Sequence, residues 1–299
     1  MVDRDGAFAP FRSYQRPYNL AKERVESTTL PSTTESRDVK VVLFCGGLGT
    51  RLRENSDTIP KPLVNVGYQP FLWHLMRYYA HYGHTDFILC LGYRGDLIRE
   101  YFLNYNECMS NDFTLSEGGR HVELHGSSIQ DWKITFVDTG LHATIAERLI
   151  RVREYLKDEP VFLANYSDGL SDLPLPDQLA HFDRSDAIAG FAAVHSRQTF
   201  HTIHADSDGF VTGIGSAGNG DFMINAGFFV LRQQIFDYVE DGEELVEQPF
   251  ARLIEQRRLA AFRHRGFWQS MDTFKDKLAF DRMEARGDCP WAVWKSPPE

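Results

Sequence analysis

The sequence predicts an α/β protein built on a doubly wound, mostly parallel β-sheet covered by helices. Short apolar runs rich in β-branched residues, without polar alternation, take turns with segments of helical spacing. Turns rich in glycine, or containing aspartate, follow two of these runs. A chain of 299 residues with 42% hydrophobic content is large enough to bury such a sheet. In open sheets of this kind, ligands bind outside the carboxyl ends of the strands.

The first 37 residues differ in character from the rest. Pro10, Pro17 and Pro31 interrupt them, and the run STTLPSTTES is polar. We expect a flexible N-terminal extension over 1–37. An arm that docks on a neighbouring subunit is the alternative, because FRSYQRPYNL carries three aromatic residues.

From residue 38 onward, strands and helices alternate in two parts, a nucleotide-binding half (38–175) and an acceptor-binding and assembly half (176–295). In the first half we expect strands at 39–44, 86–92, 134–140 and 160–169, and helices at 70–83, 95–105 and 143–156. In the second half we expect a helix after Pro176, a strand at 187–195 and a hairpin that turns at 206–209. We then expect a strand at 223–231, two short helices, a strand at 260–266 and a helix at 273–285.

Composition excludes several classes of function. The net charge of -10 argues against binding of nucleic acid or an anionic membrane, which depends on clustered Lys and Arg. The four cysteines are scattered, without a Cys-x-x-Cys pair for zinc or a disulfide framework. No apolar run reaches the roughly 20 residues of a membrane span. We expect a cytoplasmic protein.

The stretch LFCGGLGTRLRENSDTIPKP, residues 43–62, is typical of a phosphate-binding loop. It is not a Walker loop, which ends in Gly-Lys followed by Ser or Thr. A dinucleotide fingerprint would need a third glycine where this chain has leucine. Gly46, Gly47 and Gly49 leave no Cβ in the way, so backbone N–H groups can close on the phosphates of a nucleotide.

Two cations complete this loop. Arg51 supplies a fork of donors suited to phosphate oxygens. The prolines on both sides of Lys61 stiffen the backbone and fix the direction of its ammonium group. Both side chains are expected to neutralise phosphate charge.

The run GGLGTRL, followed after eight residues by KP, resembles the signature of the sugar-1-phosphate nucleotidyltransferases. FLWHLMRYYAHYG, GYRGDLIREYFLNY, WKITFVDTG, INAGFFVL and GFWQSMDTFKDK resemble one branch of them, the glucose-1-phosphate cytidylyltransferases. The resemblance covers roughly 39–295. It implies a Rossmann-like nucleotidyltransferase fold, a homo-oligomer, and an enzyme that joins CTP, or another nucleoside triphosphate, to a sugar 1-phosphate with Mg²⁺.

The same resemblance implies roles for particular residues. Catalytic roles fall to Arg51 and Lys61. The nucleotide would be held by Phe44, Gly46, Gly47, Gly49, Thr50, Arg51 and Lys61. Asp168 and Asp272 would bind the metal, and Arg148, Asn225 and Asp168 would bind the substrate. From the residues alone, each Asp also fits a turn or helix cap, and Arg148 and Asn225 also fit buried structural roles.

The acceptor half departs from the family pattern. The family carries Glu-Lys-Pro shortly before the strand with Asn225, and its lysine grips the sugar phosphate, whereas this chain has no lysine between Val211 and Asn225. Three readings stay open. Arg197, His201 or His204 replaces the lost charge, the acceptor is a different phosphate or phosphonate, or the protein binds a nucleotide without catalysis.

Overall fold

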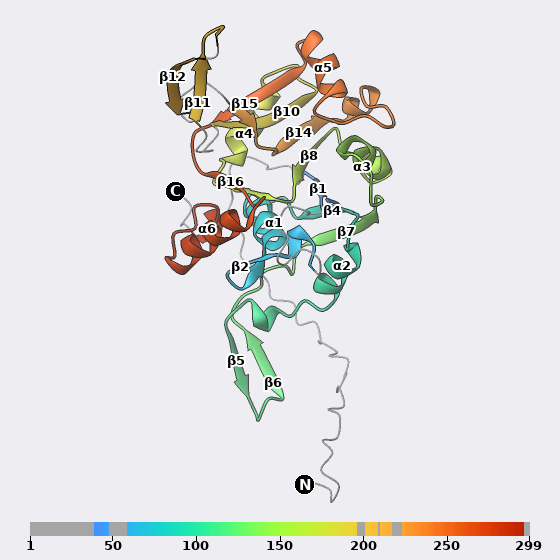
Figure 1. The fold of residues 1–299 in the computed structure, drawn as a ribbon. Coiled ribbons are helices and arrows are strands. Elements are labelled where there is room, and N and C mark those ends of the chain that lie inside the picture. Colours follow the sequence, from blue (N-terminus) through green and yellow to red (C-terminus); the bar gives the residue numbers. More distant parts are fainter. Residues whose placement is uncertain (1–38, 48–58, 196–200, 209, 217–222, 296–299) are drawn as a thin grey trace, which may run out of the picture. The chain divides into compact units, whose positions relative to one another are not determined.

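The computed structural model describes residues 39–47, 59–195, 201–208, 210–216 and 223–295 (Figure 1). Of residues 201–205 and 214–216 it describes the backbone alone. The chain divides into two units, Met1–Ser36 and Arg37–Glu299, and the following concerns the second. The predicted extension, 1–37, lies outside the described residues.

An eight-stranded sheet forms the centre of this unit. Its members are β1 (Val41–Phe44), β4 (Asp86–Leu91), β7 (Lys133–Asp138), β8 (Val161–Tyr166), β10 (Ala189–His195), β13 (Met223–Asn225), β14 (Phe229–Arg232) and β15 (Leu259–His264). The order is β13-β10-β14-β8-β1-β4-β7, and β15 pairs with β10. Strands β8, β1, β4 and β7 are mutually parallel, and β15 is parallel to β10. Strand β14 runs antiparallel to both β8 and β10. The predicted mostly parallel sheet is confirmed.

Helices connect the parallel strands and pack around the sheet (Figure 1). They are α1 (Phe71–His81), α2 (Gly95–Leu103), α3 (Ile145–Val152), α4 (Leu175–Asp183), α5 (Gln248–Glu255) and α6 (Phe274–Ala285). Shorter 3-10 turns are η1 (Lys61–Leu63), η2 (Glu107–Met109), η3 (Arg153–Leu156), η5 (Gln233–Asp237) and η6 (Val293–Lys295). Thr144 and Thr273 are the N-caps of α3 and α6, and each forms a reciprocal capping box with the residue three positions later.

Four two-stranded ladders accompany the main sheet. They are β2 (Asn65–Val66) with β3 (Gln69–Pro70), β5 (Phe113–Ser116) with β6 (His121–Leu124), β9 (Gly169–Ser171) with β16 (Trp268–Ser270), and β11 (His201–Ala205) with β12 (Val211–Ser216). The last is the hairpin expected around 206–209. The other three were not expected from the sequence.

One strand prediction is wrong. The run 223–231 forms two strands, β13 and β14, in place of one. Gly227 and Phe228 between them adopt φ values of 78° and 50°, in the left-handed region, which breaks the extended backbone. Along one edge of β10, β13 pairs near its carboxyl end and β14 near its start.

The core is formed by the sheet and the buried faces of the helices, and α1 contributes most of its residues to it. Leu43, Phe87, Phe162 and Phe229 are fully buried on the strands. Eight of the eleven residues of α1 are buried, which explains why its sequence is apolar on nearly every side. No helix in the described residues is long and apolar enough to cross a membrane.

Candidate active site

The backbone around Lys61 has the rigidity that its flanking prolines predict. Pro60 caps the 3-10 turn η1 with φ -66° and ψ 146°. Pro62, which follows Lys61 directly, is buried. The Leu63 N–H donates to the Pro60 carbonyl oxygen at 2.8 Å. Lys61 therefore leaves the chain from a closed turn with a fixed direction.

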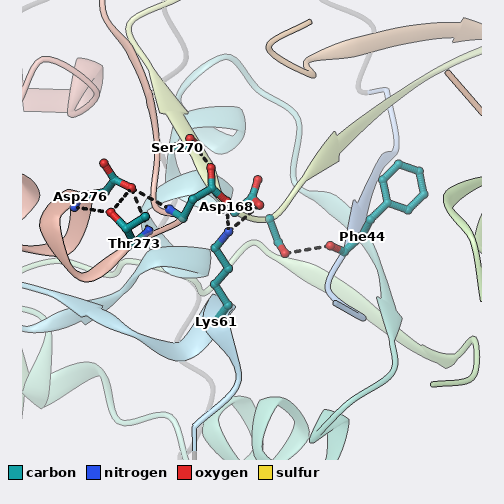
Figure 2. Close-up of polar contacts among 8 residues, drawn as sticks. Phe44, Lys61, Asp168, Ser270, Thr273 and Asp276 are labelled. Carbon is teal, nitrogen blue, oxygen red and sulfur yellow. Dashed lines mark hydrogen bonds and ion pairs between the residues drawn. The ribbon is translucent and has the colours of Figure 1, made fainter. Parts of the chain in front are cut away.

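The Lys61 ammonium joins the two aspartates that the resemblance assigns to the metal. Its Nζ lies 2.8 Å from Asp168 Oδ2 and 2.7 Å from Asp272 Oδ1 (Figure 2). The Lys61 side chain is 15% exposed, and those of Asp168 and Asp272 are 35% and 44% exposed. Burial by itself would lower the pKa of Lys61, but the two carboxylates outweigh it and raise the pKa above its ordinary value.

The β9–β16 ladder brings the two aspartates together. Asp168 follows β8 and immediately precedes β9, and Asp272 comes two residues after β16. Gly169 faces Ser270 in the register, and the Met271 N–H donates to the Asp168 carbonyl oxygen at 2.8 Å. Two aspartates that are 104 positions apart in the sequence thereby bind the same Lys61 Nζ atom.

Asp272 is also held in place at the start of helix α6. Ser270 Oγ donates to Asp272 Oδ2 at 2.7 Å. The Asp272 and Thr273 N–H groups donate to Asp276 Oδ2 at 3.2 and 2.8 Å (Figure 2). The N-terminal end of a helix favours negative charge, so this position suits a carboxylate. Sequence reasoning missed Ser270 and Asp276, although Thr-x-x-Asp before a helix is a recognisable capping signal.

In the described part of the glycine loop, Gly46 lies against the guanidinium of Arg148. A Cβ atom on Gly46 would lie 2.0 Å from Arg148 Nη1, so any larger residue there requires the Arg148 guanidinium to move from its present hydrogen bonds. Gly47 is exposed and has open space around it. Gly49, Thr50 and Arg51 lie outside the described residues, so their predicted contacts stay predictions.

Arg148 is 3% exposed and is bound to neutral oxygens of the fold. It donates to Thr139 Oγ1 at 2.6 Å, to the Leu91 carbonyl at 3.3 Å and to the Gly46 carbonyl at 3.1 Å. Burial lowers its pKa below the ordinary value of arginine. These contacts show a structural role beneath the loop, and direct contact with a phosphate stays a prediction.

Phe44 and Asn225 lie along the same carboxyl edge of the sheet. The Phe44 carbonyl oxygen accepts from Ser167 Oγ at 2.8 Å, and its ring is turned away from Lys61 (Figure 2). Asn225 ends β13, and its Oδ1 accepts from the Gly227 N–H at 2.9 Å. No local pattern points to Asn165, whose buried Oδ1 accepts from the Phe228 N–H at 2.9 Å and ties β8 to this turn.

The oxygen ligands that Mg²⁺ prefers are present at this site. Magnesium is usually bound by one or two carboxylates together with substrate phosphates, and Asp168 and Asp272 supply two carboxylates 2.7–2.8 Å from a common atom. Among the described residues there is no group of three or more His, Cys, Asp or Glu side chains that fits a metal ion. Two carboxylates with room for further oxygen ligands fit a magnesium site that is completed by the phosphates of a substrate.

Comparison with known proteins identifies the family of this chain. A family model described as nucleotidyl transferase matches residues 40–278. The chain is 38% identical over 258 residues to the probable glucose-1-phosphate cytidylyltransferase of Bacillus subtilis, and 39% identical over 259 residues to the glucose-1-phosphate cytidylyltransferase of Salmonella typhi. Each alignment covers 86% of this chain and 100% of the relative. The crystal structure of HddC from Yersinia pseudotuberculosis shares the fold, with a TM-score of 0.60 at 21% identity over 82% of this chain and 99% of that one. The chain belongs to the nucleotidyl transferase family.

Proposed function

We propose that this protein transfers a cytidylyl group from CTP to glucose 1-phosphate, forming CDP-glucose and pyrophosphate. The observation that carries the proposal is the cluster of Lys61, Asp168 and Asp272 at the carboxyl edge of the sheet. The choice of CTP and glucose 1-phosphate follows the relatives at 38–39% identity, which are named for that reaction.

The reaction needs charge neutralisation more than it needs a base. An oxygen of the sugar phosphate attacks the α-phosphorus, a new P–O bond forms, and the bond from the α-phosphorus to pyrophosphate breaks. A phosphate monoester is largely dianionic at pH 7, so no group has to remove a proton from the nucleophile. Two anions must meet in line, and cations at fixed positions lower that barrier.

Lys61 is suited to this work because its present partners are exchangeable. It is held by two side-chain carboxylates that are each at least one-third exposed. We propose that Asp168 and Asp272 hold Mg²⁺, which supplies positive charge to the phosphates when bound. The Lys61 ammonium then donates to phosphate oxygens, from the direction that Pro60 and Pro62 impose.

The acceptor half is the part of the proposal with the least support. The Arg197 residue and the side chains of His201 and His204, expected to replace the family lysine, lie outside what the structure describes. The missing lysine favours a second candidate, in which CTP is the donor and the acceptor is another phosphate or phosphonate.

The decisive experiment measures pyrophosphate release with Mg²⁺ for each pairing of CTP, UTP, dTTP, ATP and GTP with a panel of sugar 1-phosphates. Release that is fastest with CTP and glucose 1-phosphate supports the proposal. Protection of the fold against heat by CTP, without release from any sugar 1-phosphate, supports the second candidate. Neither release nor protection by any nucleotide overturns both.

A further inference from the structure

A pocket of about 70 Å³ lies at the carboxyl edge of the sheet, between β10 and β15. The two strands are parallel, with Val194 of β10 opposite His264 of β15, so their carboxyl ends meet at the same edge. Pockets for whole drug-sized ligands run to about 300 Å³ or more, so this one suits a single small group. Its lining consists of Val194, His195, His264, Arg265, Gly266 and Trp268.

The lining of this pocket is basic, although the chain as a whole carries a net charge of -10. It contains one arginine and two histidines but no Asp or Glu side chain. Arginine is always charged, and histidine can carry a proton near neutral pH. His195 and Arg265 are exposed, and within the described part of the chain neither side chain is engaged in an ion pair. Both are therefore available to an anion that enters from solvent.

Asp172 fixes the orientation of the third basic side chain, His264. This histidine is 7% exposed, and its Nε2 lies 2.8 Å from Asp172 Oδ1 and 3.2 Å from the Phe267 carbonyl oxygen. Both neighbours are acceptors, so Nε2 carries a proton and donates it. The Phe267 N–H also donates to Asp172 Oδ1, at 2.7 Å. A Cβ atom on Gly266 would lie 2.3 Å from Asp172 Oδ1 and 2.6 Å from His264 Cε1, so a side chain there would displace the pair.

One aromatic ring separates the pocket from the segment that carries Asp168. Trp268 lines the pocket, and its indole lies against Gly169, which directly follows Asp168. A Cβ atom on Gly169 would lie 3.1 Å from Trp268 Nε1. The same Nε1 donates to the Ala226 carbonyl oxygen at 3.0 Å, which fixes the ring. A group bound in the pocket is therefore a neighbour of the site that Asp168 forms with Lys61.

We propose that this pocket binds the phosphate group of the acceptor, and that Arg265 and His195 supply the positive charge for which this chain has no Glu-Lys-Pro lysine. The inference rests on the proposed function and names the residues that hold its second substrate. Phosphate is the only charged group of a sugar 1-phosphate, so a basic lining selects that part of the molecule. The guanidinium of Arg265 offers paired donors that match phosphate oxygens.

The position of the pocket in the sheet separates the acceptor from the nucleotide. Strands β14 and β8 lie between β10 and β1, which precedes the glycine loop. At about 4.8 Å from strand to strand, β10 lies roughly 14 Å from β1. A nucleotide bound by the loop after β1 therefore leaves this pocket to the second reactant, and Asp168, at the end of the intervening β8, lies between the two.

The first test measures binding without turnover. The chain is titrated calorimetrically with glucose 1-phosphate, and separately with inorganic phosphate, in the absence of nucleotide. Arg265→Gln is expected to weaken both affinities about tenfold or more, because a charge-assisted contact is lost, whereas Arg265→Lys keeps the charge and most of the affinity. Arg263→Gln, which changes an exposed arginine of β15 outside the lining, is the matched control and is expected to bind as the wild type does. Thermal unfolding confirms that the variants fold. A wild-type chain that binds neither compound, or equal binding by Arg265→Gln and the wild type, overturns the proposal.

The second test separates this inference from the proposed function. In the pyrophosphate-release assay, Arg265→Gln is expected to raise the KM for the sugar 1-phosphate about tenfold or more and to leave the KM for CTP at the wild-type value. Normal wild-type turnover with an unchanged KM for the sugar 1-phosphate in Arg265→Gln overturns the inference and leaves the function standing. Wild-type protein that binds inorganic phosphate through Arg265 but does not turn over glucose 1-phosphate overturns that choice of acceptor and supports the pocket as the site of a different phosphate.

Discussion

Two cations at the carboxyl edge of the same sheet have opposite surroundings. Lys61 is bound by two carboxylates that solvent reaches. Arg148 is bound by a hydroxyl and three backbone carbonyls and is 3% exposed. The family resemblance implies that both of them bind the nucleotide or the substrate.

The difference in surroundings indicates that Lys61 is available for chemistry, whereas Arg148 stabilises the fold. The oxygens around Arg148 belong largely to the backbone and cannot leave without disrupting strand ends, whereas the carboxylates around Lys61 can exchange one cation for another. A buried charged group is tolerated only when its hydrogen-bonding atoms have partners. The N–H groups of Arg148 have such partners in the fold itself. Variants at both sites, and at related groups, test this distinction.

The largest effect is expected at Lys61. Lys61→Ala should lower kcat/KM roughly 10³-fold, about 4 kcal/mol, because a cation that stabilises developing charge is lost. Its partners are partly exposed, so the melting temperature should change little. The measurement is pyrophosphate release, with Lys133→Ala, from the exposed pair with Asp86, as the control. Near-normal turnover in Lys61→Ala would contradict the mechanism.

Arg148→Met should instead act on stability. It removes the donor from the Gly46 carbonyl oxygen and from Thr139 Oγ1, whereas the Leu91 carbonyl oxygen keeps the Thr139 N–H and hydroxyl as donors, at a cost of about 3 to 4 kcal/mol in the free energy of unfolding. Urea unfolding measures the loss. A variant with wild-type stability but no turnover would break the comparison and place Arg148 in contact with a phosphate.

His74 of helix α1 is a second polar group that, like Arg148, is buried and bound by atoms of the fold. Its Nε2 lies 3.0 Å from the Val66 carbonyl oxygen and its Nδ1 accepts from Trp291 Nε1 at 3.4 Å, which fits a neutral ring. Burial lowers its pKa from 6.5 to about 4. The unfolded chain therefore binds the proton more tightly, and stability falls as pH drops from 6.5 towards 4, by at most about 3 kcal/mol.

His74→Gln removes this titration and should flatten the loss of stability between pH 6.5 and 4. Urea unfolding at several pH values measures the slope. Exposed His121→Gln is the control and should keep the wild-type slope. An unchanged slope in His74→Gln would show that other groups cause the acid sensitivity.

The smallest effect is expected from neutralising one carboxylate of the Lys61 cluster. Asp168→Asn and Asp272→Asn should each raise the Mg²⁺ concentration for half-maximal rate about tenfold or more, since one anionic ligand is lost. A metal titration of the rate measures this, with Asp86→Asn as the control. A variant with an unchanged titration would exclude that aspartate from the metal site.

Local pattern was sufficient for much of the fold. The continuous apolar runs predicted β1, β4, β7 and β8, and the two prolines predicted a rigid Lys61. The split of 223–231 was missed because the left-handed Phe228 is held by Asn165, 63 positions away, and no local signal reveals that contact. Apolar and polar residues alternate in β5 and β6, which is a local signal for strands, although neither strand was predicted.

The sequence by itself determined the strand and helix pattern, the glycine loop and the family, because propensity, periodicity and motif spacing depend on near neighbours. Only the tertiary structure decided that Asp168 and Asp272 meet on Lys61, through the β9–β16 ladder, and that Arg148 lies buried beneath Gly46. Strand pairing and burial are set by long-range packing, and the same residue types serve a reactive cluster or a structural one according to how much solvent reaches them.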